Sequence, residues 1–197
     1  MAEESFALRD VIDLAGWYEG LLCRAFPPSE CKPLGLVKEL IGQGRYRVLG
    51  LYEGETLLGF AALWGNPDHP DWVLLDYLAV DESRRNHGLG REILRRLPSV
   101  CGEGQGIVLE SESPVPGDDE AENALRRRRI GFYERCGFHG VYEMATCGAR
   151  FQAMVSGEPP KDPQTVMEAH RGIYGPTRVD VVVPLPPGMK PPKSLFE

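Results

Sequence analysis

The sequence predicts a mixed α/β fold in one domain, and three observations support this. A chain of 197 residues is long enough for a single domain with its own core. Strand-like apolar runs and helix-like amphipathic segments succeed one another along the chain. The run at residues 72–80 is almost continuously apolar, which is typical of a central strand covered on both faces. Hydrophobic residues at 42% and charged residues at 26% are ordinary for a globular protein.

The N-terminal part predicts two helices and a hairpin. Apolar residues at helical spacing predict a first helix over residues 11–26, and a shorter helix follows over residues 34–41. Residues 46–52 and 56–64 are strand-like, and the short Gly-containing loop between them predicts antiparallel pairing.

The remaining chain predicts three more helices and four more strands besides the central one. The expected helices cover residues 89–97, 118–135 and 163–174. The expected strands cover residues 106–110, 141–146, 150–155 and 179–183. Asp118 is the expected N-cap of the long helix, and Gly137 is expected to terminate it.

Charge and cysteine content exclude several classes of function. A net charge of −7 argues against nucleic-acid binding, which relies on many basic side chains. The acidic start and the lack of a long apolar run predict a soluble cytoplasmic protein without membrane contact. The five cysteines show neither a disulfide pattern nor metal-ligand spacing, so no metal site is expected.

One motif points to a ligand. The segment Arg85-Asn86-His87-Gly88-Leu89-Gly90 has the form R-x-x-G-x-G and leads directly into a predicted helix. Glycines allow close backbone approach, and the free N–H groups of a helix start bind phosphate. An ordinary strand-to-helix turn is the alternative. The dinucleotide and Walker A fingerprints are absent, which disfavours nicotinamide and nucleoside-triphosphate enzymes.

The order of motifs resembles the GNAT superfamily of N-acetyltransferases. The resemblance is carried by LLDYLAVDESRRNHGLG, a helix, a strand and then IGFYERCGF, and it is clearest from Val73 to Phe138. It implies a mixed, mostly antiparallel central sheet with helices on both faces and a splayed pair of central strands. On this basis residues 1–157 form an acetyl-CoA-binding catalytic domain. Residues 158–197 form an extension packed on it, with a helix, a strand and a Pro-rich tail.

The resemblance also implies acetyl-CoA as cosubstrate. In the family the R-x-x-G-x-G loop binds the CoA pyrophosphate, and pantetheine lies along the central strand. The residues that inherit the phosphate contact are Arg85, Asn86, His87, Gly88, Leu89, Gly90 and Arg91. Leu78, Ala79 and Val80 inherit the pantetheine contact.

Two carboxylates are candidates for the base that deprotonates the acceptor amine. Asp76 interrupts the apolar central strand, where burial could make it basic. A buried carboxylate paired with an arginine or with backbone N–H groups is an equal alternative. Glu110 ends the following strand and is the second candidate, although Ser111 and Glu112 beside it suggest a segment entering solvent.

Tyr133 is the candidate acid. It occupies the position in FYERCGF from which family members protonate the departing thiolate. Packing is its alternative role, and Cys136 is expected to be a spectator thiol. Asn123 lies ten residues before Tyr133, where many relatives have an Asn about seven before, so its cofactor contact is not carried over. Arg128 or Arg129 is expected to face inward and to need an anionic partner.

The predicted function is acetyl transfer from acetyl-CoA to a primary amine of a small molecule or peptide. The alternative is an acyl-CoA-binding interaction domain without transfer activity. Trp17, Tyr18, Glu19 and Glu30 in the N-terminal segment suit a cationic acceptor, but they equally suit a core edge and a surface. The sequence leaves the oligomeric state open, with a homodimer among the alternatives.

Overall fold

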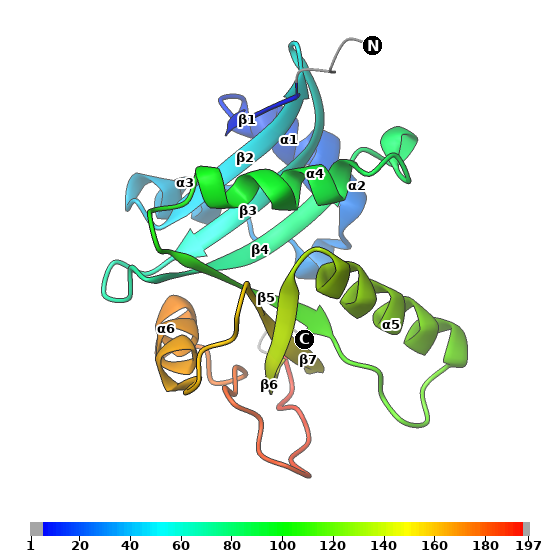
Figure 1. The fold of residues 1–197 in the computed structure, drawn as a ribbon, viewed down its shortest axis with the longest axis vertical. Coiled ribbons are helices and arrows are strands. Elements are labelled where there is room, and N and C mark those ends of the chain that lie inside the picture. The colour runs from blue at the N-terminus through cyan, green and yellow to red at the C-terminus, as the bar shows by residue number, and fades with distance from the viewer. Residues whose placement is uncertain (1–5, 195–197) are drawn as a thin grey trace. The chain divides into compact units, whose positions relative to one another are not determined.

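The computed structural model describes residues 6–194, which form two compact units. Unit 1 contains the chain up to Trp64 together with Leu75–Glu103. Unit 2 contains Gly65–Leu74 and the chain from Gly104 onward. Both units combine helices with mostly antiparallel strand pairs, so the predicted mixed α/β class is confirmed (Figure 1).

Unit 1 is built on strands in the order β1-β2-β3-β4. They are β1 (Phe6–Asp10), β2 (Tyr46–Glu53), β3 (Thr56–Gly65) and β4 (Trp72–Val80), the last of which joins unit 1 from Leu75. The strand pairs β1–β2 and β2–β3 are antiparallel. Strand β1 was not predicted, because a five-residue strand that ends in Arg and Asp gives too short an apolar pattern.

Two glycines in unit 1 allow backbone conformations or contacts that the sheet requires. Gly54 has a φ of +59° in the turn between β2 and β3, which confirms the predicted hairpin. A Cβ at Gly59 would lie 2.8 Å from the Ala79 carbonyl oxygen and 3.2 Å from Ile93 Cδ1. Glycine at this position therefore permits the close approach of β3 to β4.

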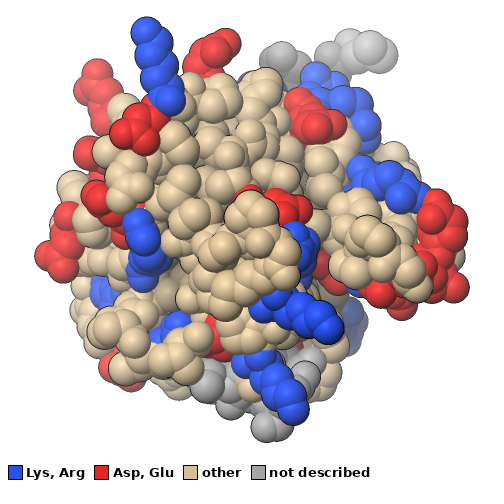
Figure 2. Space-filling model, turned by 90° about the horizontal axis from the view of Figure 1, so that it is seen from below, with Lys and Arg blue, Asp and Glu red and all other residues tan. Residues whose placement is uncertain are grey.

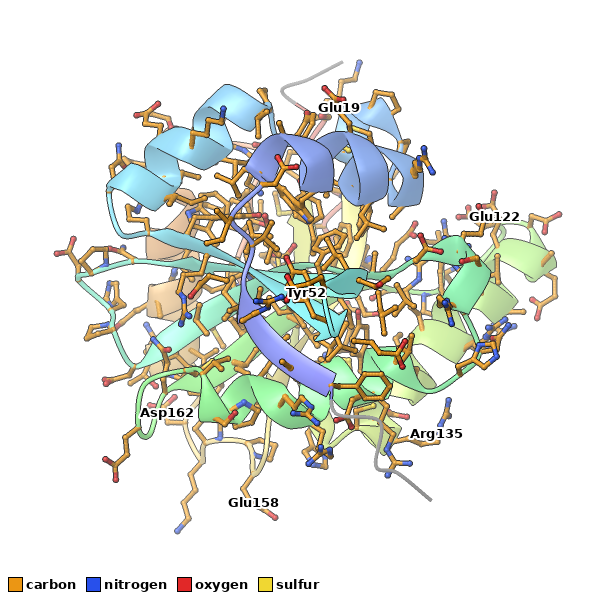
Figure 3. All side chains as sticks on the ribbon, turned by 90° about the horizontal axis from the view of Figure 1, so that it is seen from above. Glu19, Tyr52, Glu122, Arg135, Glu158 and Asp162 are labelled. Atoms are coloured by element: carbon orange, nitrogen blue, oxygen red, sulfur yellow. The ribbon has the colours of Figure 1, made fainter. Side chains whose placement is uncertain are left out.

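The helix predicted over residues 11–26 is divided into three short segments. They are α1 (Leu14–Trp17), the π-helical η1 (Tyr18–Leu22) and α2 (Cys23–Ala25). Asp13 caps the first segment, since its Oδ1 accepts a hydrogen bond from the Gly16 N–H at 2.9 Å. An i→i+5 turn places residues five apart on one face, so both Trp17 and Leu22 are buried. In Figure 3, Glu19 points outward from this segment.

Helices cover both faces of the unit 1 sheet. The predicted α3 (Leu34–Gly42) is confirmed, and α4 (Leu89–Arg96) follows the loop after β4, with the 3-10 turn η4 (Leu97–Ser99) behind it. Figures 1 and 3 show α1 to α3 on one face of the sheet and α4 on the other. The core between them is apolar: the rings of Trp17 and Phe60 meet edge to face at 5.3 Å between centroids.

Unit 2 is built on strands in the order β5-β7-β6, with both pairs antiparallel. They are β5 (Gly106–Glu112), β6 (Phe138–Thr146) and β7 (Ala149–Ser156). Helix α5 (Glu120–Arg135) connects β5 to β6. Its N-cap is Asp119 and not the predicted Asp118, because the Asp119 carboxylate accepts hydrogen bonds from the N–H groups of Ala121 and Glu122. Gly137, with a φ of +85°, follows the helix as predicted.

The C-terminal part of unit 2 contains one helix and an irregular tail. Helix α6 (Gln164–Tyr174) confirms the prediction. The strand predicted over residues 179–183 is a single bridge between Val182 and Ala145. The tail contacts β6 further on through the Leu185 N–H, which donates to the Glu143 carbonyl at 2.7 Å. Pro184 and Pro186 lack N–H groups, so a regular ladder cannot continue there.

The surface carries both signs of charge. Lysine and arginine side chains are interspersed with aspartate and glutamate on the face seen in Figure 2. Among the helices of residues 6–194, none has the length and apolar character needed to cross a membrane.

Candidate functional site

The R-x-x-G-x-G segment forms a tight loop between β4 and α4. Asp81 begins it by capping the 3-10 turn η3 (Glu82–Arg84), since its Oδ1 accepts a hydrogen bond from the Ser83 N–H at 2.9 Å. Asn86 and Gly88 have φ values of +67° and +79°. The His87 ring turns back on the loop, with Nδ1 2.9 Å from the Arg85 carbonyl oxygen. These conformations turn the chain from the strand into the helix.

The loop presents a row of unpaired backbone donors. The N–H groups of Asn86, His87 and Gly88 donate to no acceptor within residues 6–194. The next N–H groups belong to the first turn of α4, where an α-helix has no internal acceptors to offer. The helix dipole adds positive potential at this end. Such a row of donors suits an anion, and phosphate binding by residues 85–91 stays a prediction.

A pocket of about 440 Å³ lies beside this loop in unit 1. Two arginines line it: Arg85 from the loop and Arg24 from α2, with Asp81, Glu82 and the end of β4 at Val80. Arg24 was not predicted here, because helical spacing does not show that the N-terminal segment meets the loop. A ligand bound to the loop could therefore extend through this pocket along the end of β4.

The backbone of β4 has donors that point away from β3. The Asp81 N–H donates to the Leu58 carbonyl of β3 at 2.8 Å. Hydrogen-bonding direction alternates along a strand, so the N–H groups of Leu78 and Val80 point to the opposite edge. Ala79 instead directs its carbonyl towards Gly59. The donors of Leu78 and Val80 therefore do not contact β3.

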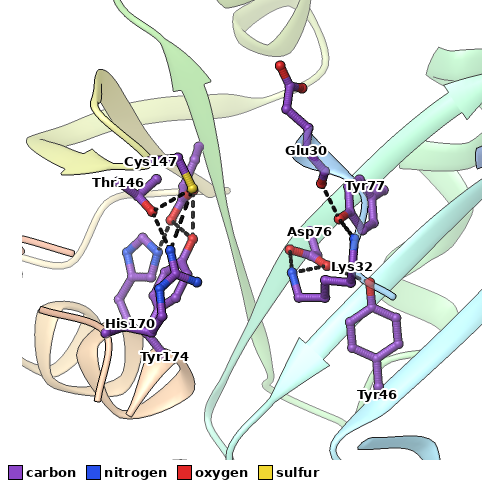
Figure 4. Close-up of polar contacts among 11 residues, drawn as sticks. Glu30, Lys32, Tyr46, Asp76, Tyr77, Thr146, Cys147, His170 and Tyr174 are labelled. Atoms are coloured by element: carbon purple, nitrogen blue, oxygen red, sulfur yellow. Dashed lines mark hydrogen bonds and ion pairs between the residues drawn. The ribbon is translucent and has the colours of Figure 1, made fainter. Parts of the chain in front are cut away.

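Asp76 forms a partly buried ion pair. Both its oxygens accept hydrogen bonds from Lys32 Nζ, at 2.7 and 2.8 Å, and Oδ2 also accepts one from the Tyr46 hydroxyl at 2.5 Å (Figure 4). Burial, and then the Asp76 charge, raise the pKa of Tyr46 well above its usual value, so this phenol stays protonated. The partner is a lysine, whereas the sequence analysis considered an arginine or backbone N–H groups. Nothing in the sequence indicated Lys32, which lies 44 residues away.

Glu110 lies in a polar cluster and does not enter solvent. Its side chain is 13% exposed. His170 Nε2 lies 2.7 Å from Oε1, and the Tyr174 hydroxyl donates to both oxygens at 2.7 and 2.9 Å. The opposite ring nitrogen of His170 lies 3.0 Å from the hydroxyl of Tyr142, whose pKa is raised by burial and by the Glu110 charge. Both nitrogens of the fully buried His170 are thus engaged.

Nothing in the sequence indicated that His170 would lie beside Glu110. The pairing spans 60 residues and depends on where α6 packs. In unit 2 the helix brings His170 and Tyr174 to the carboxylate on β5. The only local signal was that both residues lie on one predicted helix at i, i+4 spacing.

Tyr133 lies on the last turns of α5 with its ring between two others. The ring centroids of Phe132 and Phe138 are 5.3 and 6.0 Å away. Burial raises the pKa of Tyr133 to about 12, and Cys136 adds to the rise while Arg129 opposes it. Its hydroxyl has no hydrogen-bond partner within the described chain. A protonated, unpartnered phenol remains free to donate to a ligand.

The basic cluster on α5 is organised around a different arginine from those expected. Arg126 is enclosed, with 12% exposure, and pairs with Glu112 at 2.8 Å and Asp118 at 2.7 Å. Arg128 is exposed, and Arg129 is half-exposed 3.8 Å from Glu112. Neither Arg128 nor Arg129 therefore faces inward as expected, and Leu125 on the same helix is itself 55% exposed.

Asn123 has a structural role. It is buried on the first turns of α5, and its side chain exchanges two hydrogen bonds of 2.8 Å with the backbone of Val115. The contact fixes the loop between β5 and α5. Oδ1 also accepts a hydrogen bond from Arg126 Nη1 at 3.1 Å, so it already has two donors within the protein.

Comparison with known proteins gives one consistent result. A family model described as an acetyltransferase (GNAT) domain matches residues 44–140. A solved structure assigned to the GNAT acetyltransferase family of Bacteroides thetaiotaomicron is 25% identical, with a TM-score of 0.68, over 87% of this chain and 99% of that chain. No curated protein sequence matches.

Two further solved structures share the fold at lower identity. The ribosomal-protein-S18-alanine N-acetyltransferase of Escherichia coli is 19% identical, with a TM-score of 0.56, over 80% of this chain and 98% of that chain. An aminoglycoside 6′-N-acetyltransferase complexed with coenzyme A is 17% identical, with a TM-score of 0.60, over 79% of this chain and 99% of that chain.

Proposed function

Because the chain belongs to the GNAT acetyltransferases, we propose that it transfers the acetyl group of acetyl-CoA to a primary amine. The observation that carries the proposal is the row of unpaired N–H groups in the loop before α4, beside a pocket with two arginines. Solved structures of the same fold include an aminoglycoside 6′-N-acetyltransferase, a spermidine N-acetyltransferase and a ribosomal-protein-S18-alanine N-acetyltransferase. Their acceptors share an amine, which is the class proposed here.

The residues of the loop fit a CoA pyrophosphate. The backbone donors of residues 86–91 would hold its oxygens, with Arg85 and Arg24 as charged neighbours. Space supports the assignment, since a Cβ placed on Gly88 would meet no atom within 4 Å. Along β4 the N–H groups of Leu78 and Val80 would bind pantetheine or polarise the acyl carbonyl. When bound, acetyl-CoA supplies the acetyl group as a thioester.

The acceptor must lose a proton before it attacks. An alkylamine has a pKa of about 10.4, so only about one molecule in a few thousand is neutral at pH 7. We propose Asp76 as the proton acceptor, because it already holds an ammonium group, that of Lys32, at 2.7 Å. Glu110 remains the second candidate, supported by the His170 ring, which could take the proton onward.

In the transfer itself, the amine nitrogen forms the C–N bond while the C–S bond breaks. The thiolate that leaves needs a proton, and we propose that Tyr133 donates it. Its unpartnered hydroxyl supports this role. A pKa of about 12 keeps the phenol protonated throughout the neutral range, although it also makes the phenol a weak acid.

The proposal is tested by measuring thiol release from acetyl-CoA with separate panels of polyamines, aminoglycosides, amino acids and peptides with free N-termini. We expect amine-dependent release and an acetylated product of the matching mass. The second candidate function, an acyl-CoA-binding domain without transfer, predicts calorimetric binding of CoA without release in any panel. Absence of both binding and release would contradict both functions.

A further inference from the structure

The side chain of Lys32 lies inside a cage of acidic and aromatic groups in unit 1. Its Nζ is bound by the Asp76 carboxylate and lies 4.4 Å from the centroid of the Trp64 ring and 5.2 Å from that of Tyr77. The Tyr46 hydroxyl closes the carboxylate side (Figure 4). One carboxylate with aromatic faces around it is the usual protein recognition set for an ammonium ion.

The walls of the cage belong to the sheet, but its occupant does not. Tyr46 lies on β2, Trp64 on β3, and Asp76 and Tyr77 on β4, and the three aromatic side chains are buried. Lys32 instead enters from the loop between η2 (Pro28–Glu30) and α3. The site is therefore preformed by rigid elements, and a flexible side chain fills it.

The loop that carries Lys32 is held mainly by polar contacts. No described side chain between residues 27 and 36 is buried. The Tyr77 hydroxyl accepts a hydrogen bond from the Lys32 N–H at 3.0 Å and donates one to the Glu30 carbonyl at 2.7 Å. Segments with few buried apolar contacts open at low cost, so this loop can leave while the sheet stays intact.

We propose that Lys32 occupies the position of the acceptor's ammonium group and that an unbranched primary alkylammonium acceptor displaces it. The inference rests on the proposed function and specifies its substrate class. Asp76 and Leu78 lie two residues apart on β4, about 7 Å along the strand. An ammonium in the cage thus lies within one side-chain length of the proposed acyl site. Lys32 then acts as an internal plug that admits only acceptors able to replace its charge.

Binding can be measured without any acetyl transfer. Lys32→Ala removes the stem beyond Cβ and leaves room for propylammonium, so propylammonium chloride is titrated calorimetrically into wild-type and variant protein. We expect about tenfold or more tighter binding by Lys32→Ala, the range of a partly desolvated ammonium in an aromatic site. Propanol, which lacks the charge, and the double variant Lys32→Ala/Asp76→Asn should show no such gain. Equal binding by wild-type and Lys32→Ala overturns the proposal.

Kinetics then test whether the acceptor uses the cage. The KM for a propylamine acceptor should fall in Lys32→Ala and rise in Lys32→Arg, because a guanidinium binds a carboxylate in bidentate fashion. Lys38→Ala, at an exposed position of α3, controls for the loss of a lysine charge. Spermidine and a blocked lysine peptide, used as separate acceptors, distinguish a polyamine from a protein source of the same ammonium.

Each outcome decides a separate point. An unchanged KM in both Lys32 variants overturns the role of the cage in acceptor binding, even if propylammonium binds to Lys32→Ala. If Lys32→Ala does not fold, the comparison of wild-type with Lys32→Arg decides alone. If no amine is acetylated by any variant, the proposed function fails, while the calorimetric comparison still decides whether the cage is an ammonium site.

Discussion

Substitution of Gly88 by alanine separates the cost of backbone strain from the loss of a ligand contact. Gly88 has a φ of +79°, in the left-handed region, and no atom lies within 4 Å of the position that a Cβ would occupy. Alanine therefore meets no steric obstacle within the described protein. Its stability cost should be the conformational penalty alone, about 1–2 kcal/mol. If CoA lies against the loop, the added methyl group instead enters the space of the phosphate.

Gly54 provides a matched control in the same unit. It has a φ of +59° and equally open space, but it lies in the turn of the β2–β3 hairpin and not in the R-x-x-G-x-G segment. We expect Gly54→Ala and Gly88→Ala to lose similar amounts of unfolding free energy in urea. Only Gly88→Ala should lose CoA affinity, by about tenfold or more, which corresponds to at least about 1.4 kcal/mol of binding free energy.

The assay is isothermal titration of acetyl-CoA into each variant at a temperature well below its unfolding transition. Gly88→Val should bind more weakly still, because its branched side chain is larger and more strained at positive φ. An affinity of Gly88→Ala equal to that of Gly54→Ala, in folded protein, would refute the assignment of residues 85–91 to the cofactor.

Three other predictions concern single groups. Tyr133→Phe should lower kcat by about 10²-fold, with little change in acetyl-CoA affinity. This is the weaker end of the range for a general acid, because the pKa of Tyr133 is raised. A wild-type kcat in the variant, where chemistry limits turnover, contradicts the role of Tyr133 as proton donor. Asp76→Asn should remove the acidic limb of the pH profile of kcat/KM, and if Glu110→Gln removes it instead, Glu110 is the base. Glu92, whose pKa is lowered to about 2 by hydrogen bonds from Arg95 and Arg96, should stabilise the fold by about 1–3 kcal/mol at pH 7 after allowance for exposure. Because the folded pKa is depressed, this contribution is complete above about pH 4.5 and is lost as the pH falls towards about 2. Urea unfolding of Glu92→Gln and wild-type should therefore converge in that window, and a constant difference contradicts the ion-pair explanation.

Local sequence patterns predicted those parts of the fold in which neighbouring residues determine the structure. The β2–β3 hairpin, α3, α4, α5 and α6 were each expected close to their observed bounds. Local patterns predicted the structure less well where tertiary packing determines it. The π-helical η1 is explained by the need to bury both Trp17 and Leu22, which requires knowledge of the sheet beneath them. The bridge at Val182 likewise depends on β6, which the tail meets only after folding.

The same distinction applies to the candidate site. The glycine loop could be recognised in the sequence, because its donors are consecutive backbone groups from residue 85 to residue 91, and its contact with CoA stays a prediction. The partners of Asp76 and Glu110 could not, since Lys32 and His170 reach them from elements 44 and 60 residues away. Both carboxylates stand out in the sequence, but local patterns do not show which cationic or polar groups surround them.

These two carboxylates also differ in what they could do, and the difference follows from their partners. Asp76 is paired with a flexible ammonium that an incoming ammonium can replace without leaving a buried charge unpaired. Glu110 is held by a fully buried histidine and a tyrosine of α6, and no soluble acceptor can take the place of those groups. Of these two carboxylates, only Asp76 can therefore exchange one bound cation for another. For this reason we propose that Asp76 binds the acceptor, and Glu110, with His170 beside it, stays the second candidate for the proton acceptor.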